Sequence, residues 1–337
     1  MQEKNKPVYM QIADMIREQI ETGEIKPGDK LMSENEMTKA YGVARLTVRE
    51  ALGVLVNEGF LEKKHGKGTF CKMSRRGLSI DVLLDMNDFY FIPYYVRSIS
   101  AVLDKNGADF IVGDTKNSWD EIIKLLKKII KRGSDGIIVQ VSPQKDFDKG
   151  EIKRIFDEVQ NAGIPLLQID TKSGIDGVPL LIMDEEKIGK LAAKCFIEHG
   201  HKKMAYIARD NCNISDMRMK YFKESFPDAR RIDFDGKLSE SIRSAYDDGI
   251  TGIFCFNDFV AKSCIDAMNS IGLRMPEDIS LVGVDDTLLS KVYNLTSVTH
   301  AKEEIGECAA KMIVEGRLEN VVFEPELSKR TSVKDIL

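Results

Sequence analysis

The sequence predicts an α/β protein in two parts: a small N-terminal domain of three helices and a hairpin, then a larger body of parallel sheets. The length of 337 residues is enough for two or three domains. The net charge of −5 divides unevenly, because residues 1–77 hold 14 lysines and arginines against 11 aspartates and glutamates, which leaves −8 on the remainder. From residue 78 onward, short apolar runs alternate with amphipathic stretches.

The N-terminal domain is predicted to contain three helices. Pro7 suits a first helical turn, and apolar residues then recur at intervals of three or four up to Gly23. Ser33–Glu36 has the spacing of a capping box, which predicts a second helix from there to Gly42. After a tight turn, a third helix is predicted over Arg45–Asn57, with its apolar residues on one face.

Two short helices joined by a tight turn are typical of the helix-turn-helix, whose second helix enters the major groove of DNA. The polar face of the third helix carries Arg45, Thr47 and Arg49. Guanidinium groups bind guanine edges and hydroxyl groups bind phosphates. The residues that follow indicate a hairpin with a glycine-rich tip bearing His65 and Lys67. Any one of these side chains alone could simply be solvated, but their joint placement favours a winged helix-turn-helix on double-stranded DNA.

Four motifs within residues 1–72 resemble the winged helix-turn-helix of the GntR family. They are Pro7-Val8-Tyr9-x-Gln11-Ile12, Gly28-Asp29-Lys30-Leu31-x-Ser33-Glu34, Thr47-Val48-Arg49-x-Ala51-Leu52 and Gly66-x-Gly68-Thr69-Phe70. The resemblance implies a DNA surface made of Ser33, Glu34, Arg45, Thr47, Arg49, His65, Lys67 and Thr69. Two positions depart from the family pattern, with Met32 in place of the usual proline and Ala44 in place of the serine that caps the recognition helix. The missing cap is expected to cost about 1 kcal/mol.

In the body, apolar runs and amphipathic stretches predict nine strands and the helices between them. The strands are Ile80–Leu84, Ala108–Val112, Gly136–Val141, Pro165–Ile169, Pro179–Met183, Met204–Ala208, Arg231–Phe234, Gly252–Phe256 and Ser280–Val284. Helices include Trp119–Lys131, Glu185–His199, Asp258–Ile271 and Glu303–Glu315. Such regular alternation implies parallel sheets with helices on both faces, in two lobes.

Polar and aromatic side chains follow several of these strands, where ligands of parallel sheets bind. The candidate effector-binding residues are Tyr90, Phe91, Gln140, Asp170, Arg218, Asn257 and Asp285. Carboxylates, amides and a guanidinium beside aromatic rings suit a small polyol, whose hydroxyls need donors and acceptors and whose C–H face needs apolar cover. Alternatives remain: Asp258 and Asp286 could cap helices, Tyr90 and Phe91 could be core, and Arg218 could form a surface ion pair.

The body, residues 79–337, resembles the effector domain of the LacI/GalR family, itself similar to periplasmic sugar-binding proteins. The resemblance rests on Asp184-Glu185-x-x-x-Gly189, His199-Gly200-His201-Lys202-x-Met204-Ala205-Tyr206-Ile207, Phe256-Asn257-Asp258, the run from Pro276 to Asp286, and Leu295-Thr296-Ser297-Val298. It implies that Arg218, Asn257 and Asp285 contact the sugar, with Asp170 and the aromatic residues around Tyr90 lining the cleft. We expect a linker over 73–78, one lobe over 79–182 with 301–318, and the other over 183–299 with 319–337.

The combination of these two domain types resembles the repressors of arabinose utilisation. It implies a sugar-responsive regulator that leaves its operator when sugar closes the effector domain. The expected partners are double-stranded operator DNA, a second copy of the chain, and a small sugar, L-arabinose or a related pentose. The alternatives are a regulator of another sugar, a sugar phosphate or a purine, and, more distantly, an enzyme.

Several classes of site and segment are not indicated by the sequence. The six cysteines form no C-x-x-C, the four histidines do not cluster, and there is no G-x-S-x-G motif, so no catalytic residue, metal or cofactor is expected. The cysteines are expected to be buried, reduced thiols. No apolar run approaches the roughly 18 residues of a membrane helix, and the N-terminus lacks the core of a signal peptide. A cytoplasmic protein with no membrane partner is therefore expected.

Overall fold

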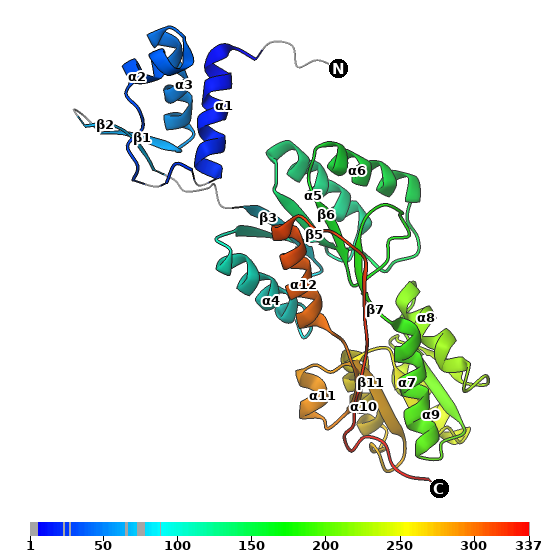
Figure 1. Ribbon diagram of the computed structural model, residues 1–337. Helices are drawn as coiled ribbons and strands as arrows, with labels where there is room; N and C mark the ends of the chain where they lie inside the picture. Colours follow the sequence, from blue (N-terminus) through cyan, green and yellow to red (C-terminus); the bar gives the residue numbers. More distant parts are fainter. Residues whose placement is uncertain are drawn as a thin grey trace. The chain divides into compact units, whose positions relative to one another are not determined.

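The chain divides into two compact units, Met1–Gly77 and Leu78–Leu337, and each is described by itself. The structure, a computed structural model, describes all residues except 1–5, 23, 27, 65, 66, 73–77, 88 and 337 (Figure 1). The predicted helix end at Gly23, the wing residue His65 and most of the expected linker therefore lie outside the described residues. In the described part of the chain, no helix has the length and apolar character needed to cross a membrane.

The first unit consists of three helices and a hairpin, as the sequence predicts. The elements are α1 (Val8–Glu21), α2 (Glu34–Tyr41), α3 (Arg45–Asn57), β1 (Leu61–Lys64) and β2 (Gly68–Cys71). The two strands pair antiparallel. Apolar side chains from all three helices and the hairpin, including Ile16, Met37, Leu52 and Leu61, are buried in one core. Full burial of each such side chain contributes about 1.5–3 kcal/mol.

Two helix ends in this unit show how local sequence sets the structure. Ser33 Oγ accepts a hydrogen bond from Glu36 N (3.3 Å) and Ser33 N donates to the Glu36 carboxylate (2.7 Å), which completes the predicted capping box of α2. Gly42 ends α2 in the left-handed region, at φ 67°, where glycine has no steric cost. Ala44 precedes α3 and provides no side-chain cap, as predicted.

The second unit contains two six-stranded sheets, one in each lobe. The first-lobe sheet has the strand order β13-β7-β6-β5-β3-β4, and the second-lobe sheet has the order β14-β12-β11-β10-β8-β9. Neighbouring strands run parallel, apart from the antiparallel pair β12–β14. Figure 1 shows each sheet flanked by helices.

The elements of the first lobe are β3 (Ser79–Leu84), α4 (Ile92–Lys105), β4 (Asp109–Asp114), α5 (Trp119–Arg132), β5 (Gly136–Gln140), α6 (Lys149–Asn161), β6 (Leu166–Ile169), β7 (Leu180–Met183), α12 (Lys302–Glu315) and β13 (Val321–Phe323). Those of the second lobe are α7 (Glu185–Glu198), β8 (Met204–Ala208), α8 (Asn213–Lys223), β9 (Arg230–Asp233), α9 (Leu238–Asp247), β10 (Gly252–Cys255), α10 (Asp258–Ser270), β11 (Ser280–Asp285), α11 (Leu288–Val292), β12 (Thr296–Thr299) and β14 (Leu327–Ser328). The nine predicted strands and four named helices are confirmed, with ends shifted by at most two residues.

Both faces of the central first-lobe strands β3, β5 and β6 are buried, which explains their nearly continuous apolar runs, whereas the edge strand β4 is largely exposed. Along β3, Ile80 and Val82 pack with α4 and α12, whereas Leu83 packs with α5 and α6 on the opposite face. The approach of α12 to α4 is close, because a Cβ added at Gly306 would lie 2.2 Å from Ser98 Oγ. Five of the cysteines are buried, and Cys308 is half-buried.

One expected lobe boundary is wrong. Residues 319–337 were expected in the second lobe, but β13 pairs parallel with β7 in the first-lobe sheet, with Phe323 opposite Met183. The chain crosses to the second lobe only after Phe323, where β14 pairs with β12. A strand of three residues has too little periodicity to indicate which sheet edge it joins.

Candidate functional site

The predicted DNA-binding residues of the first unit gather around one groove. It has a volume of about 590 Å³ and is lined by Lys30, Leu31, Met32, Ser33, Glu34, Asn35, Arg45, Arg49, Lys63, Lys64, Lys67, Gly68 and Thr69. Six of the eight predicted residues are in this lining. Thr47 is half-buried on α3 and does not line the groove, and His65 lies outside the described residues.

Glu34 holds the two arginines of the groove together. Its Oε2 accepts hydrogen bonds from Arg45 Nε (2.9 Å) and Arg49 Nη2 (3.1 Å), and these bonds, that from Arg49 first, lower the pKa of Glu34. The two arginine side chains nevertheless stay 59 % and 54 % exposed. The carboxylate therefore orients both guanidinium groups at the start of α3 while most of their surface remains accessible to a ligand.

Sequence reasoning missed three lysines of the groove, Lys30, Lys63 and Lys64. The segment before α2 is tied to the hairpin, because Leu31 N donates to Thr69 O (3.0 Å) and Lys30 bridges to Phe70. This contact brings Lys30 beside the wing. Lys63 and Lys64 directly precede the glycine-rich tip of the hairpin, and this position in the sequence would have indicated that they belong to the DNA surface. A face with this many cations beside a helix start suits a phosphate backbone.

In the second unit, the "inner cavity" lies between the two lobes at the carboxyl ends of their strands. It has a volume of about 100 Å³ and is lined by Asp85, Phe91, Ile92, Thr115, Asn117, Gln140, Val141, Ser142, Pro143, Asp170, Thr171, Arg209, Ile214, Arg218, Phe256, Asn257, Asp285 and His300. The structure thus brings together six of the seven predicted effector-binding residues. Strands β5, β6, β10 and β11 end here, and this explains the convergence.

The seventh predicted residue, Tyr90, lines an adjoining space, the "outer cavity". This cavity has a volume of about 230 Å³ and is lined by Asp85, Asn87, Phe89, Tyr90, Arg209, Phe234, Phe256, Asn257, Phe259 and Val260. Of the two aromatic residues that could have been core, Phe91 is buried, whereas Tyr90 is 41 % exposed.

Asp170 occupies the first-lobe side of the inner cavity with both carboxylate oxygens engaged. Its Oδ1 lies 2.9 Å from His300 Nε2, and its Oδ2 accepts from Gln140 Nε2 (2.8 Å). Burial would raise the pKa of Asp170, but the hydrogen bond and charge of His300 outweigh it, so the pKa is lowered. His300 follows β12, where the chain passes between lobes, and sequence reasoning did not assign it to the site.

Arg218 and Glu185 form a buried ion pair on the second-lobe side. Arg218 Nε and Nη2 donate to the two Glu185 carboxylate oxygens (2.6 and 3.2 Å), and Nη1 donates to Phe256 O (2.6 Å). The guanidinium lies over the Phe256 ring, 5.0 Å from its centroid. Burial opposes the charge, but Glu185 outweighs it and raises the pKa of Arg218. The pair is buried, so the alternative of a surface ion pair does not hold.

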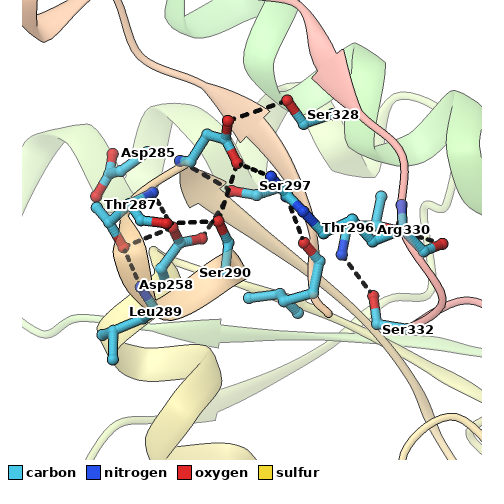
Figure 2. Close-up of polar contacts among 12 residues, drawn as sticks. Asp258, Asp285, Thr287, Leu289, Ser290, Thr296, Ser297, Ser328, Arg330 and Ser332 are labelled. Carbon is cyan, nitrogen blue, oxygen red and sulfur yellow. Dashed lines mark hydrogen bonds and ion pairs between the residues drawn. The ribbon is translucent and has the colours of Figure 1, made fainter. Parts of the chain in front are cut away.

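A polar network holds the chain where β11 ends (Figure 2). Asp258 Oδ2 accepts from Thr287 N (2.7 Å) and Thr287 Oγ1 (2.9 Å), and Oδ1 accepts from Ser297 Oγ (2.7 Å). Burial, with the nearby charge of Asp285, raises the pKa of Asp258 to about 7. Asp286 pairs with Arg330 Nη2 (2.7 Å). Neither aspartate caps a helix.

This network supports a strained turn. Asp285 and Asp286 both have positive φ, 100° and 45°, a region that side chains other than glycine rarely occupy. The cap of α10 is instead Asn257, whose Oδ1 accepts from Val260 N (3.0 Å). The residues of the network do not line the inner cavity; they hold the turn after β11 and so fix the position of Asp285, which does line it.

The two lobes touch beside the cleft through a contact that we call the latch. Asn213 N donates to Pro143 O (3.1 Å), Lys145 N donates to Asn211 Oδ1 (3.3 Å), and Lys145 Nζ pairs with Asp216 Oδ2 (2.7 Å). Pro143 and Lys145 follow β5 of the first lobe, whereas the other three residues lie around the start of α8 in the second lobe. The latch links the lobes in this structure.

Two buried polar atoms near the cleft, Tyr95 Oη and His300 Nδ1, have no hydrogen-bond partner among the described residues. Phe91 packs edge-on against both rings, with centroid distances of 5.3 Å to Tyr95 and 4.8 Å to His300. Buried polar groups usually find a partner in protein, water or ligand. Within the described ranges, no group of three histidine, cysteine or carboxylate side chains could hold a metal ion.

Comparisons with known proteins find a matching family model in each unit. Residues 8–71 match the bacterial regulatory proteins of the gntR family. Residues 80–231 match the periplasmic binding proteins and sugar binding domain of the LacI family, and residues 193–333 match a periplasmic binding protein-like domain.

Similarity to single proteins extends over the whole chain. The arabinose metabolism transcriptional repressor of Geobacillus stearothermophilus is 26 % identical, with 100 % of both chains covered. That of Halalkalibacterium halodurans is 27 % identical over 97 % of this chain and 96 % of its own. A crystal structure of a LacI family regulator from Enterococcus faecalis with bound ribose superimposes with a TM-score of 0.67 at 20 % identity, covering 77 % of this chain and 100 % of that one.

Proposed function

We propose that this chain, a transcriptional regulator and not an enzyme, represses genes of pentose utilisation. It joins a GntR-type winged helix-turn-helix to a LacI-type effector domain. L-arabinose or a related pentose is the effector that releases it from its operator. The observation that carries the proposal is the inner cavity, in which acidic, amide and aromatic side chains from both lobes converge. The names of the full-length relatives favour arabinose.

The lining of the inner cavity suits a neutral sugar. Asp85, Asp170 and Asp285 present acceptors for hydroxyl groups, and Phe91 and Phe256 offer apolar faces for C–H groups. A sugar phosphate fits less well, because three carboxylates would repel it. The charge of Arg218 is already matched by Glu185. Arg209 is the arginine of the lining that has no ion pair among the described residues, and it stands against three carboxylates in the same lining.

Sugar is proposed to act by holding the two lobes together. Gln140 and Asp170 belong to the first lobe and Arg218, Asn257 and Asp285 to the second, so a ligand that contacts both stabilises a closed arrangement. Because operator and sugar favour different states, each weakens the binding of the other, with a coupling of about 1–3 kcal/mol.

The chain is proposed to bind its operator as a homodimer in the cytoplasm. The first 77 residues carry a net charge of only +3, so one unit makes few phosphate contacts. Two units on two half-sites multiply these contacts without new chemistry.

The test pairs DNA binding with sugar binding. An operator selected from random duplexes is titrated with the full chain in the presence of L-arabinose, D-xylose, D-ribose and hexoses. At least one pentose should weaken operator binding tenfold or more and raise the melting temperature. A DNA affinity that stays constant across the panel would refute the proposal.

A variant separates the two functions. Arg49→Ala should abolish operator binding while the sugar-induced rise in melting temperature persists, because Arg49 lies in the first unit. The matched control, Arg154→Ala on α6, should change neither measurement. Operator binding that survives in Arg49→Ala would contradict the assigned DNA surface, whereas parallel loss of both activities would indicate unfolding.

A further inference from the structure

We propose that the outer cavity is a second sugar subsite and that the domain accepts a disaccharide, with a pentose ring in the inner cavity and a glycosidically linked ring in the outer one. This inference rests on the proposed function and extends it. The two cavities adjoin, because Asp85, Arg209, Phe256 and Asn257 line both. The outer cavity, at about 230 Å³, is the larger of the two. A monosaccharide in the inner cavity would leave this space without a ligand.

Aromatic rings dominate the outer cavity. Tyr90, which follows β3 of the first lobe, faces Phe259 on α10 of the second lobe, with ring centroids 6.3 Å apart and planes inclined by 30°. Phe234 meets Phe259 at a similar distance and 78°. Tyr90 and Phe259 remain 41 % and 45 % exposed, and Phe89 is 79 % exposed. Exposed aromatic side chains gathered beside a ligand cleft indicate a surface that a ligand covers.

The junction of the two cavities has the polar groups that a glycosidic linkage requires. A glycosidic oxygen has no proton and can only accept, so it needs a donor nearby. Among the described residues the Arg209 side chain has no ion pair, only its backbone N being bonded, to Ser215 Oγ, and Asn257 uses its Oδ1, not its amide nitrogen, to cap α10. Both line the junction. Asp85 adds an acceptor for a flanking hydroxyl.

The polar groups of the outer cavity also suit a sugar as the second ring. Asn87 lines the outer cavity beside Asp85, whose Oδ1 accepts from Asn87 Nδ2 (2.8 Å). A carboxylate (Asp85), a guanidinium (Arg209) and two amides (Asn87 and Asn257) thus line the outer cavity together with the aromatic rings. Hydroxyl groups use both donors and acceptors and the C–H face of a sugar packs on aromatic rings, so this lining suits a sugar ring.

Calorimetric titration of the full chain tests the proposal with matched probes. The probes are L-arabinose and its 1,5-linked disaccharide, D-xylose and its 1,4-linked disaccharide, and adenosine. For the pentose that binds, the disaccharide should bind at least tenfold more tightly than the monosaccharide. Phe259→Ala should remove this advantage and leave monosaccharide affinity within twofold, because Phe259 does not line the inner cavity. The control Leu288→Ala, at an exposed apolar residue outside both cavities, should change neither affinity.

The outcomes separate this inference from the proposed function. If a pentose binds but its disaccharide binds no more tightly, the second subsite is refuted and the proposed function stands. An equal loss of both affinities in Phe259→Ala refutes the division into two subsites. A tenfold advantage for adenosine alone replaces the second sugar by a base and overturns the inference. If no pentose or pentoside binds, the proposed function itself is wrong.

Discussion

Replacing Arg218 by methionine should destabilise the second lobe far more than the loss of an ordinary ion pair. The Arg218 and Glu185 side chains are only 4 % and 2 % exposed, and their two hydrogen bonds leave no room for water to substitute. Arg218→Met leaves the Glu185 carboxylate buried without a partner. Breaking a buried pair in this way costs about 3–5 kcal/mol, compared with about 0–1 kcal/mol for a surface pair.

A second substitution tests this explanation. In the double variant Arg218→Met with Glu185→Leu, no charge remains buried, so stability should return to within about 2 kcal/mol of the native protein. Sugar binding should be lost in both variants, since Arg218 lines the inner cavity. Urea unfolding is followed by far-UV circular dichroism, while the fluorescence of Trp119, the single tryptophan, reports on the first lobe. If the single variant lies within about 1 kcal/mol of the native protein, or if the double variant is no more stable than the single one, the buried charge of Glu185 is not what destabilises Arg218→Met.

Two further predictions concern the latch and the network behind Asp285. Lys145→Ala removes the ion pair with Asp216, whose side chains are 46 % and 44 % exposed. The sugar dissociation constant should therefore rise no more than about fivefold, and this effect should vanish in high salt. The control Lys153→Ala, whose partner Asp157 is on the same helix, should bind sugar normally. The raised pKa of Asp258, about 7, means that the folded protein keeps a proton that the unfolded chain releases above about pH 4, so native stability falls as pH rises from 4 to 7. Asp258→Asn has no group that titrates at this position, so its stability should not fall in this way. Measured by urea unfolding, the free energy of unfolding of the variant minus that of the native protein should rise by up to about 4 kcal/mol from about pH 4 to about pH 7. A pH-independent difference between the two proteins would contradict it.

Regular local patterns made much of the fold predictable from the sequence. The capping box of Ser33 and Glu36 depends on neighbours in sequence, and both of its hydrogen bonds form. The central body strands are buried on both faces, so each stands out as an apolar run such as Ile80–Leu84. The side chains at the ends of neighbouring strands converge because parallel strands end at one edge, which explains why Gln140 at the end of β5 meets Asp170 after β6.

The remaining parts depend on contacts that a linear pattern does not encode. Glu185 reads as an ordinary acidic residue in the first turn of a helix, and only the fold shows that it pairs with Arg218. His300 lies on a passage between lobes, outside any periodic segment. Tyr90 and Phe91 are adjacent in sequence but line different cavities, a division that requires the position of both lobes.

The position of α12 and β13 in the first lobe has a consequence for how the chain is made. β13 completes, and α12 covers, a sheet that begins at Ser79, more than 200 residues upstream, whereas strands β8 to β12 of the second-lobe sheet come from one continuous stretch and only its edge strand β14 follows later. On the ribosome, strands β8 to β12 can therefore pair while the first lobe still lacks α12 and β13. A chain that terminates before Lys302 contains the whole DNA-binding unit but an incomplete cleft. Such truncated products should no longer respond to the inducer.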